Sequence, residues 1–259
     1  MKTKTKIILT AILGILSVAW IIVVLTVDVG EVGPKNTKVG LSLINSSFHD
    51  LWHYDNVGTA TFNNYNETWY KVSSYIGIFS LAVAGCMGIF GLLQLIKRKS
   101  LFKVDRCIIA LGVLYCITLA IYLFFEVVVI NYRPVIMPDE TEPAASFPSS
   151  HTLLTIVIMG SIMLFVKNYI KNTTLRYSIR FFCVIVMVTM VLARFICGVH
   201  WFSDIIGGIL IGLFLLAGYS IFAKNKLDHY TSVEGVSTSV KSPESSGSVS
   251  PESASKPST

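Results

Sequence analysis

Six long apolar runs constrain the fold of this chain more than any other feature of its sequence. An α-helix needs about 20 consecutive, mostly apolar residues to cross a bilayer. Charged residues make up only 14% of the chain, against roughly 25% in a soluble domain. The first run lacks a signal-peptide cleavage pattern, so we expect it to be retained. The sequence therefore predicts an all-α, polytopic membrane protein with six transmembrane helices, over residues 7–27, 72–96, 107–130, 151–166, 181–197 and 204–223.

The distribution of basic residues predicts how these helices are oriented. Cytoplasmic loops of membrane proteins carry an excess of Lys and Arg. Fourteen of the 21 Lys and Arg residues lie in the amino terminus, the loop between runs two and three, the loop between runs four and five, and the start of the tail. This bias predicts that both termini face the cytoplasm. It also accounts for the net charge of +6 without a nucleic-acid partner.

Two segments differ from the apolar runs in composition. In residues 28–71, the first outer loop, apolar residues recur at helical spacing and predict a short amphipathic interfacial helix. These residues are Val39, Leu43, Ile44, Phe48, Leu51 and Trp52. Residues 228–259 are rich in Ser and poor in large apolar residues, which predicts a disordered cytoplasmic tail. Residues 1–227 are then a single six-helix membrane domain.

Metal binding and disulfides are not expected. His49 and His53 are four residues apart, the spacing of two metal ligands on a helix, but no third ligand lies obviously beside them. We therefore expect a wet helix face there and no metal. The cysteines fall in or at the ends of apolar runs, where free Cys acts as a small hydrophobic residue. They are Cys86, Cys107, Cys116, Cys183 and Cys197.

Three short polar clusters interrupt the apolar sequence. The first is Arg133-Pro134, the second runs from Pro148 to His151, and the third comprises Arg194, His200 and Asp204. The predicted topology places all of them at the outer ends of helices, at one depth on one side. Ionisable groups near membrane depth are candidates for function, so we expect a single site.

The residue types in these clusters suit a phosphorylated ligand. Arg133 and Arg194 are planar, permanently charged guanidinium groups, which bind phosphate oxygens in a bidentate fork. Ser149 and Ser150 precede an apolar run, and free N–H groups at a helix amino terminus point at an anion. Either serine is equally interpretable as a helix cap.

The histidines and the aspartate suit nucleophilic catalysis. His200 and Asp204 are four apart, so on a helix they share a face. A carboxylate bound to one imidazole nitrogen fixes the tautomer and leaves the other nitrogen free to attack. His151 can donate a proton to the leaving oxygen as general acid. Together with the arginines these groups suffice for phosphoryl transfer without a metal or cofactor.

The order R-P, then P-S-x-H, then R-x5-H-x3-D resembles the signature of the type 2 phosphatidic acid phosphatase superfamily, over roughly residues 126–204. The resemblance implies that His200 forms a phosphohistidine, with Asp204 as its partner and His151 as proton donor. It implies that phosphoryl oxygens are held by Arg133, Arg194, Ser149 and amides near Ser150.

Three positions depart from the pattern of that superfamily. Glu126 stands where a Lys is usual, Ser150 where a Gly is usual, and Ala193 where a Ser is usual. We carry no role over to Glu126 or Ala193. These departures affect the choice of substrate and the efficiency more than the reaction class.

The sequence as a whole predicts a lipid phosphatase of a cell membrane, in a bacterial plasma membrane with the site facing outward. Its expected substrate is a membrane lipid phosphate: undecaprenyl diphosphate, phosphatidylglycerophosphate or phosphatidate. One alternative is a phosphotransferase that uses the same site, with an alcohol in place of water. Another is a non-catalytic lipid-phosphate binder, which Glu126 favours. A transporter is disfavoured because the sequence shows no inverted repeats.

Overall fold

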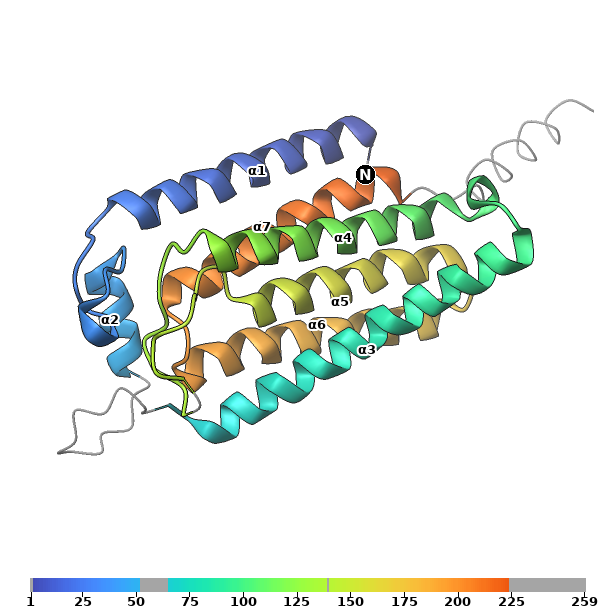
Figure 1. Cartoon of the computed structure of the whole chain (residues 1–259). Helices are drawn as coiled ribbons and strands as arrows, with labels where there is room; N and C mark the ends of the chain where they lie inside the picture. Colours follow the sequence, from blue (N-terminus) through green and yellow to red (C-terminus); the bar gives the residue numbers. More distant parts are fainter. Residues whose placement is uncertain (1, 52–64, 139, 224–259) are drawn as a thin grey trace, which may run out of the picture. The chain divides into compact units, whose positions relative to one another are not determined.

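The computed structural model describes residues 2–51, 65–138 and 140–223 (Figure 1). The predicted tail, together with Trp52 and His53, lies outside these residues. The described residues contain helices and no β-strand. In chain order these are α1 (Thr3–Thr26), η1 (Pro34–Asn36), α2 (Ser42–Leu51), α3 (Glu67–Arg98), η2 (Leu101–Lys103), α4 (Arg106–Val127), α5 (Ser150–Tyr169), α6 (Thr173–Cys197) and α7 (Phe202–Phe222).

The six long helices, α1 and α3 to α7, are each long and apolar enough to cross a membrane. The predicted all-α membrane fold with six spans is therefore confirmed. Several predicted boundaries differ from the observed ones, and the largest difference is at α6: residues 173–180, predicted as part of a basic loop, form its first two turns. The side chain of Asn172 caps this helix by accepting from the N–H of Leu175 at 3.0 Å, which starts the helix before its apolar run begins.

The predicted interfacial helix is also confirmed, as α2. Its apolar side chains are exposed, with Leu43 at 72% and Leu51 at 70%, as expected of a helix that lies against lipid. Its polar side is buried and holds the start of α7. Asn45 donates to the hydroxyl of Ser203 at 2.9 Å and accepts from the N–H of Ser203 at 3.0 Å.

Helix α5 is the centre of the bundle. It packs against α3, α4, α6 and α7, and most of its residues are buried. Glycines allow α5 and α7 to approach closely, because a Cβ at Gly160 would meet Leu216 and a Cβ at Gly212 would meet Ile156. The first residues of α5, Ser150 and His151, are therefore held by a helix that has neighbours on all sides.

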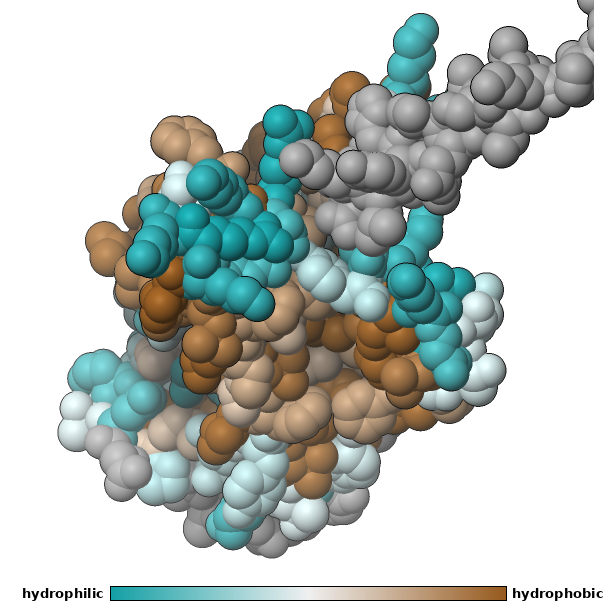
Figure 2. Space-filling model, turned by 90° about the vertical axis from the view of Figure 1, so that its right-hand side faces the viewer, coloured by the Kyte–Doolittle hydropathy of each residue, from teal (hydrophilic) through white to brown (hydrophobic). Residues whose placement is uncertain are grey.

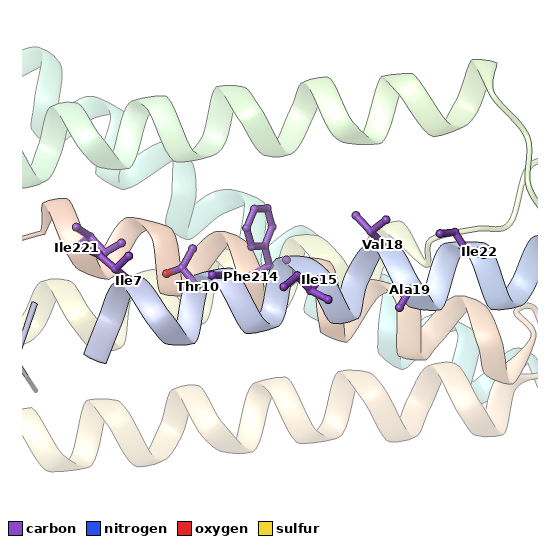
Figure 3. Close-up of a pocket in the computed structure, with 10 residues that line it drawn as sticks. Ile7, Thr10, Ile15, Val18, Ala19, Ile22, Phe214 and Ile221 are labelled. Carbon is purple, nitrogen blue, oxygen red and sulfur yellow. The ribbon is translucent and has the colours of Figure 1, made fainter. Parts of the chain in front are cut away.

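Helix α1 runs beside α7 at the edge of the bundle (Figure 1). The groove between them is lined almost entirely by apolar side chains, among them Ile7, Ile15, Val18 and Phe214 (Figure 3). Thr10 is the one polar side chain in this lining. Such a surface suits contact with lipid chains and supplies no group for chemistry.

The two ends of the bundle differ in charge. Basic side chains gather at the end where α3 ends and α4 begins, which also contains the start of α1 and the end of α5. Figure 2 shows this end, with hydrophilic groups in separate patches around apolar side chains. The three polar clusters lie at the opposite end, near α2 (Figure 1).

A network of polar side chains joins three helices at the basic end of the bundle. Asp105 accepts from Gln94 at 2.9 Å, from Arg98 at 2.7 Å and from the hydroxyl of Tyr169 at 2.7 Å. Burial alone would raise the pKa of Asp105, but the hydrogen bonds from Arg98, Tyr169 and Gln94 lower it below its ordinary value. The carboxylate is therefore ionised at pH 7 and joins α3, α4 and α5.

Asp105→Ala should destabilise the protein by about 1–3 kcal/mol, because three donors lose a charged acceptor. Thermal unfolding in detergent at pH 7 measures this as a lower Tm. Glu142→Ala is the control, since Glu142 is 72% exposed in its pair with Lys35 and should cost less than about 1 kcal/mol. Equal Tm values for the two variants would contradict the network's role.

Candidate active site

The structure brings residues of the three clusters together at the end of the bundle where α4 and α6 finish and α3, α5 and α7 begin (Figure 1). Arg133 follows α4, His151 lies in the first turn of α5, and Arg194 lies in the last turn of α6. The positive charges of Arg194 and Arg133 both act on the imidazole of His200. The predicted single site is therefore centred on His200.

The segment between α4 and α5 folds back on itself to reach this centre. Tyr132 and Ala145 form an isolated antiparallel bridge. Beside it, the N–H of Arg133 donates to the carbonyl of Ala144 and the N–H of Ser146 donates to the carbonyl of Asn131, each at 2.9 Å. This pairing of the chain places the side chains of Arg133 and Ser146 on the same pocket.

His200 lies in the turn between α6 and α7. Helix α6 ends at Cys197 and is capped by Gly198, whose φ of 75° is in the left-handed region, where glycine meets no Cβ penalty. Helix α7 begins at Phe202, so the prediction that His200 and Asp204 share a helix face is wrong. Asp204 alone is helical, and its carboxylate accepts from the N–H of Trp201 at 3.0 Å.

A serine lies between the histidine and the aspartate. His200 Nδ1 is 3.9 Å from Asp204 Oδ2, which is too long for a hydrogen bond. The hydroxyl oxygen of Ser146 is 3.0 Å from His200 Nδ1 and 2.5 Å from Asp204 Oδ2. Sequence analysis missed Ser146, because a lone serine in a loop gives no signal until the loop is folded.

Asp204 is held by further neighbours. The amide of Asn131 donates to Oδ1 at 2.9 Å, and the carbonyl of Asp204 accepts from the N–H of Ser149 at 3.0 Å. The carboxylate is fully buried. Burial of a charge is costly unless it is hydrogen-bonded, so these donors fix both its position and its rotamer. Asn131 was also missed by sequence analysis.

Arg194 is 1% exposed and is fixed from α3. Its Nη1 donates to the hydroxyl of Ser73 at 3.1 Å, and its guanidinium lies 5.7 Å from the centre of the Tyr70 ring, within cation–π range. The sequence has Ala193 where the superfamily usually has Ser, and Ser73 supplies a serine contact to this arginine from another helix.

Three nitrogen atoms at this site are buried and have no hydrogen-bond partner among the described residues. They are Arg133 Nε, Arg194 Nε and His200 Nε2. Among the described residues, neither arginine forms an ion pair with an acidic residue. An unsatisfied buried donor costs about 1–3 kcal/mol, so this arrangement suits an anion that accepts from both guanidinium groups.

A small pocket opens onto Arg133 and His200, and Arg194 is not part of its lining. Its lining includes Glu126, Arg133, Ser146, Ser150 and His200. Ser150, the first residue of α5, lies in this lining, so the amino terminus of that helix is at the pocket. The predicted role of Ser150 in substrate binding remains a proposal. Glu126, to which the sequence assigned no role, also lines it and brings a carboxylate to the same space as Arg133.

The remaining predicted residues lie beside this pocket. The hydroxyl of Ser149 accepts from Thr152 at 3.1 Å, and its backbone lies against α7 at Gly208. His151 lies against α3, where a Cβ on Gly77 would come within 2.9 Å of its ring. Neither Ser149 nor His151 is part of the pocket lining, and their predicted roles in substrate binding and proton donation remain proposals.

The surroundings of His200 favour its neutral form. Burial lowers the pKa of His200 well below its ordinary value, and the positive charges of Arg194 and Arg133 lower it further. A neutral imidazole has one protonated nitrogen and one free lone pair. The side chain is therefore suited to act as a nucleophile at neutral pH.

Two comparisons with known proteins give matches, one to a family model and one to a solved structure. Residues 108–228 match the model of the PAP2 superfamily. The fold is similar to the crystal structure of the first transmembrane PAP2 type phosphatidylglycerolphosphate phosphatase from Bacillus subtilis. The TM-score is 0.51 at 15% sequence identity, over 90% of this chain and 98% of that chain. No curated protein matches the sequence.

The fold is that of a multi-pass membrane protein of the PAP2 type. Residues 108–228 resemble the PAP2 superfamily, and the predicted resemblance to the type 2 phosphatidic acid phosphatases is confirmed.

His200 should stay neutral far below the pH at which an ordinary histidine, with a pKa of about 6.5, gains its proton. NMR of protein labelled with ¹⁵N-histidine measures this titration, with His200→Gln to assign the signal. In Arg194→Gln the pKa of His200 should rise, because one repelling charge is removed. Titration of His200 near pH 6.5 in the wild type would contradict this picture.

Gly77→Ala should lower phosphate release by about 10- to 100-fold, since the added Cβ displaces the His151 ring. The Tm should fall little, because Ala favours a helix over Gly. Gly85→Ala, on the same helix with nothing within 4 Å of the added Cβ, is the matched control and should leave the rate unchanged. Equal rates for the two variants would show that His151 is not held by this contact.

Proposed function

We propose that this protein is a membrane lipid phosphatase that works through a phosphohistidine on His200. The observation that carries the proposal is a set of three buried nitrogens at one site that have no hydrogen-bond partner among the described residues: Arg133 Nε, Arg194 Nε and His200 Nε2. A phosphoryl group satisfies all three, because its oxygens accept from the two arginines and its phosphorus accepts the histidine lone pair. The match of residues 108–228 to the PAP2 superfamily model and the similar fold support the same reaction class.

The first chemical step forms the phosphoenzyme. The lone pair of His200 Nε2 attacks phosphorus while the bond from phosphorus to the lipid oxygen breaks. His151 gives its proton to that leaving oxygen as general acid. Arg133 and Arg194 hold the phosphoryl oxygens, whose charge they stabilise in a site that excludes water. Ser149 and the amino terminus of α5 at Ser150 complete the binding of these oxygens.

The second step regenerates the enzyme. A water molecule attacks the phosphorus of the phosphohistidine and gives a proton to His151, which now acts as base. The bond between phosphorus and His200 Nε2 breaks, and inorganic phosphate leaves. The side chains supply nucleophile, acid and anion clamp, so we infer that neither step needs a metal.

The substrate is a phosphate monoester or diphosphate on a membrane lipid. The pocket lies at one end of the spanning helices, so a head group can enter it while the lipid chains remain in the bilayer. The Lys and Arg bias supports a site on the outer face of a bacterial plasma membrane. It also supports a cytoplasmic location for the tail after the 1–227 domain. Glu126 lines the pocket, and its charge disfavours a second phosphate beside it.

Purified protein in detergent with EDTA should release phosphate from at least one of three lipids: undecaprenyl diphosphate, phosphatidylglycerophosphate and phosphatidate. His200→Ala should lower the rate by at least about 10³-fold, because the nucleophile is lost. A phosphorylated wild-type intermediate, stable in alkali and labile in acid, should be trapped at short times.

The controls separate the competing functions. His200→Ala must keep the wild-type Tm, so that a lost rate reports chemistry. A strict need for divalent metal would overturn the mechanism. Binding of lipid phosphate without release would indicate a binder, and transfer of the phosphoryl group to an added alcohol in preference to water would indicate a phosphotransferase.

A further inference from the structure

Ser146 occupies the place where a direct bond between His200 and Asp204 was expected. It is 2% exposed, and its hydroxyl contacts both His200 Nδ1 and Asp204 Oδ2, at 3.0 and 2.5 Å. The two outer groups are 3.9 Å apart, beyond hydrogen-bond distance. Any influence of the carboxylate on the imidazole through hydrogen bonds must therefore pass through this serine.

The chemistry of the three groups fixes the direction of both hydrogen bonds. An ionised carboxylate only accepts, so the hydroxyl of Ser146 donates its one proton to Asp204. The serine oxygen then has only lone pairs to offer His200. His200 must donate from Nδ1, which leaves the lone pair on Nε2, the unpartnered atom at the pocket.

We propose that Ser146 is a positioning residue that couples Asp204 to His200 and sets the tautomer of the nucleophile. The proposal rests on the proposed phosphohistidine chemistry at the same site. As His200 Nε2 bonds to phosphorus, the imidazole becomes positive. Two consecutive hydrogen bonds, from Nδ1–H to the serine oxygen and from the serine O–H to the carboxylate, stabilise that charge. No proton is transferred along them.

The hydroxyl of Ser146 takes no part in the backbone contacts that fold its loop. The N–H of Ser146 donates to the carbonyl of Asn131, and the bridge of Tyr132 with Ala145 also involves backbone alone. Asp204 keeps its donors from Asn131 at 2.9 Å and Trp201 at 3.0 Å without the serine. Removing the hydroxyl leaves these backbone contacts in place, together with the backbone hydrogen bond between Ser146 and His200, so the change isolates the contribution of the hydroxyl to the orientation of His200.

The kinetic test compares Ser146→Ala with Ser161→Ala. Ser161 is equally buried and also makes two hydrogen bonds, to the Ile158 carbonyl at 2.7 Å and the Tyr115 hydroxyl at 3.0 Å, but it lies in the middle of α5. Ser146→Ala should lower kcat roughly 10- to 100-fold, the worth of a hydrogen bond to a charged group. KM should change less than about 3-fold, because the arginines still hold the phosphate. Ser161→Ala should keep the wild-type kcat.

A spectroscopic test reads the same coupling without substrate. In ¹⁵N-histidine NMR, the His200 signal of the wild type should show a protonated Nδ1 and a free Nε2. In Ser146→Ala it should shift toward a mixture of tautomers. The chain has five histidines, and His200→Gln assigns the signal by subtraction.

The proposal requires both changes. An unchanged His200 tautomer in Ser146→Ala would overturn it even if kcat fell, because the serine would then be merely structural. An unchanged kcat would overturn it even if the tautomer shifted. Failure of the proposed function is a separate result: the wild type would release no phosphate, while the wild-type tautomer would still report whether Ser146 orients His200.

Discussion

The buried carboxylate of Asp204 is the interaction on which the site depends. It is fully buried, and the donors that make its burial tolerable come from two separate segments of the chain. Asn131 and Ser146 come from the segment between α4 and α5, and Trp201 from the turn before α7. Because an unpaired buried charge is strongly unfavourable, satisfying this carboxylate assembles these segments in one arrangement.

The positively charged groups of the site differ from the Asp204 carboxylate, because their hydrogen-bonding capacity is not fully used. Arg133 and Arg194 are brought near His200 without an acidic partner among the described residues, and each keeps a buried Nε without an acceptor. The energy of packing α5 against α3, α4, α6 and α7 holds these like charges at one end of the bundle. The site therefore carries positive charge that no acidic side chain among the described residues compensates through an ion pair, and an anion would interact favourably with it. This interaction is the physical basis of the proposed phosphoryl chemistry.

The local patterns predicted much of the fold and part of the site. Apolar runs predicted the six spans, because only a bilayer-length helix accommodates them. The start of α6 was missed because Asn172 begins the helix among charged residues, which a hydropathy reading assigns to a loop. His200 was placed on the wrong element, since the spacing of four to Asp204 is equally compatible with a turn followed by a helix.

The sequence by itself determined the number of spans and the residue types at the site, because bilayer length and the chemistry of Arg, His and Asp are local properties. Only the tertiary structure decided the partners of those residues. Ser146 reaches His200 across 54 residues, Asn131 reaches Asp204 across 73, and Ser73 reaches Arg194 across 121. Such contacts depend on how loops close and helices pack, and no pattern of spacing along the chain encodes them.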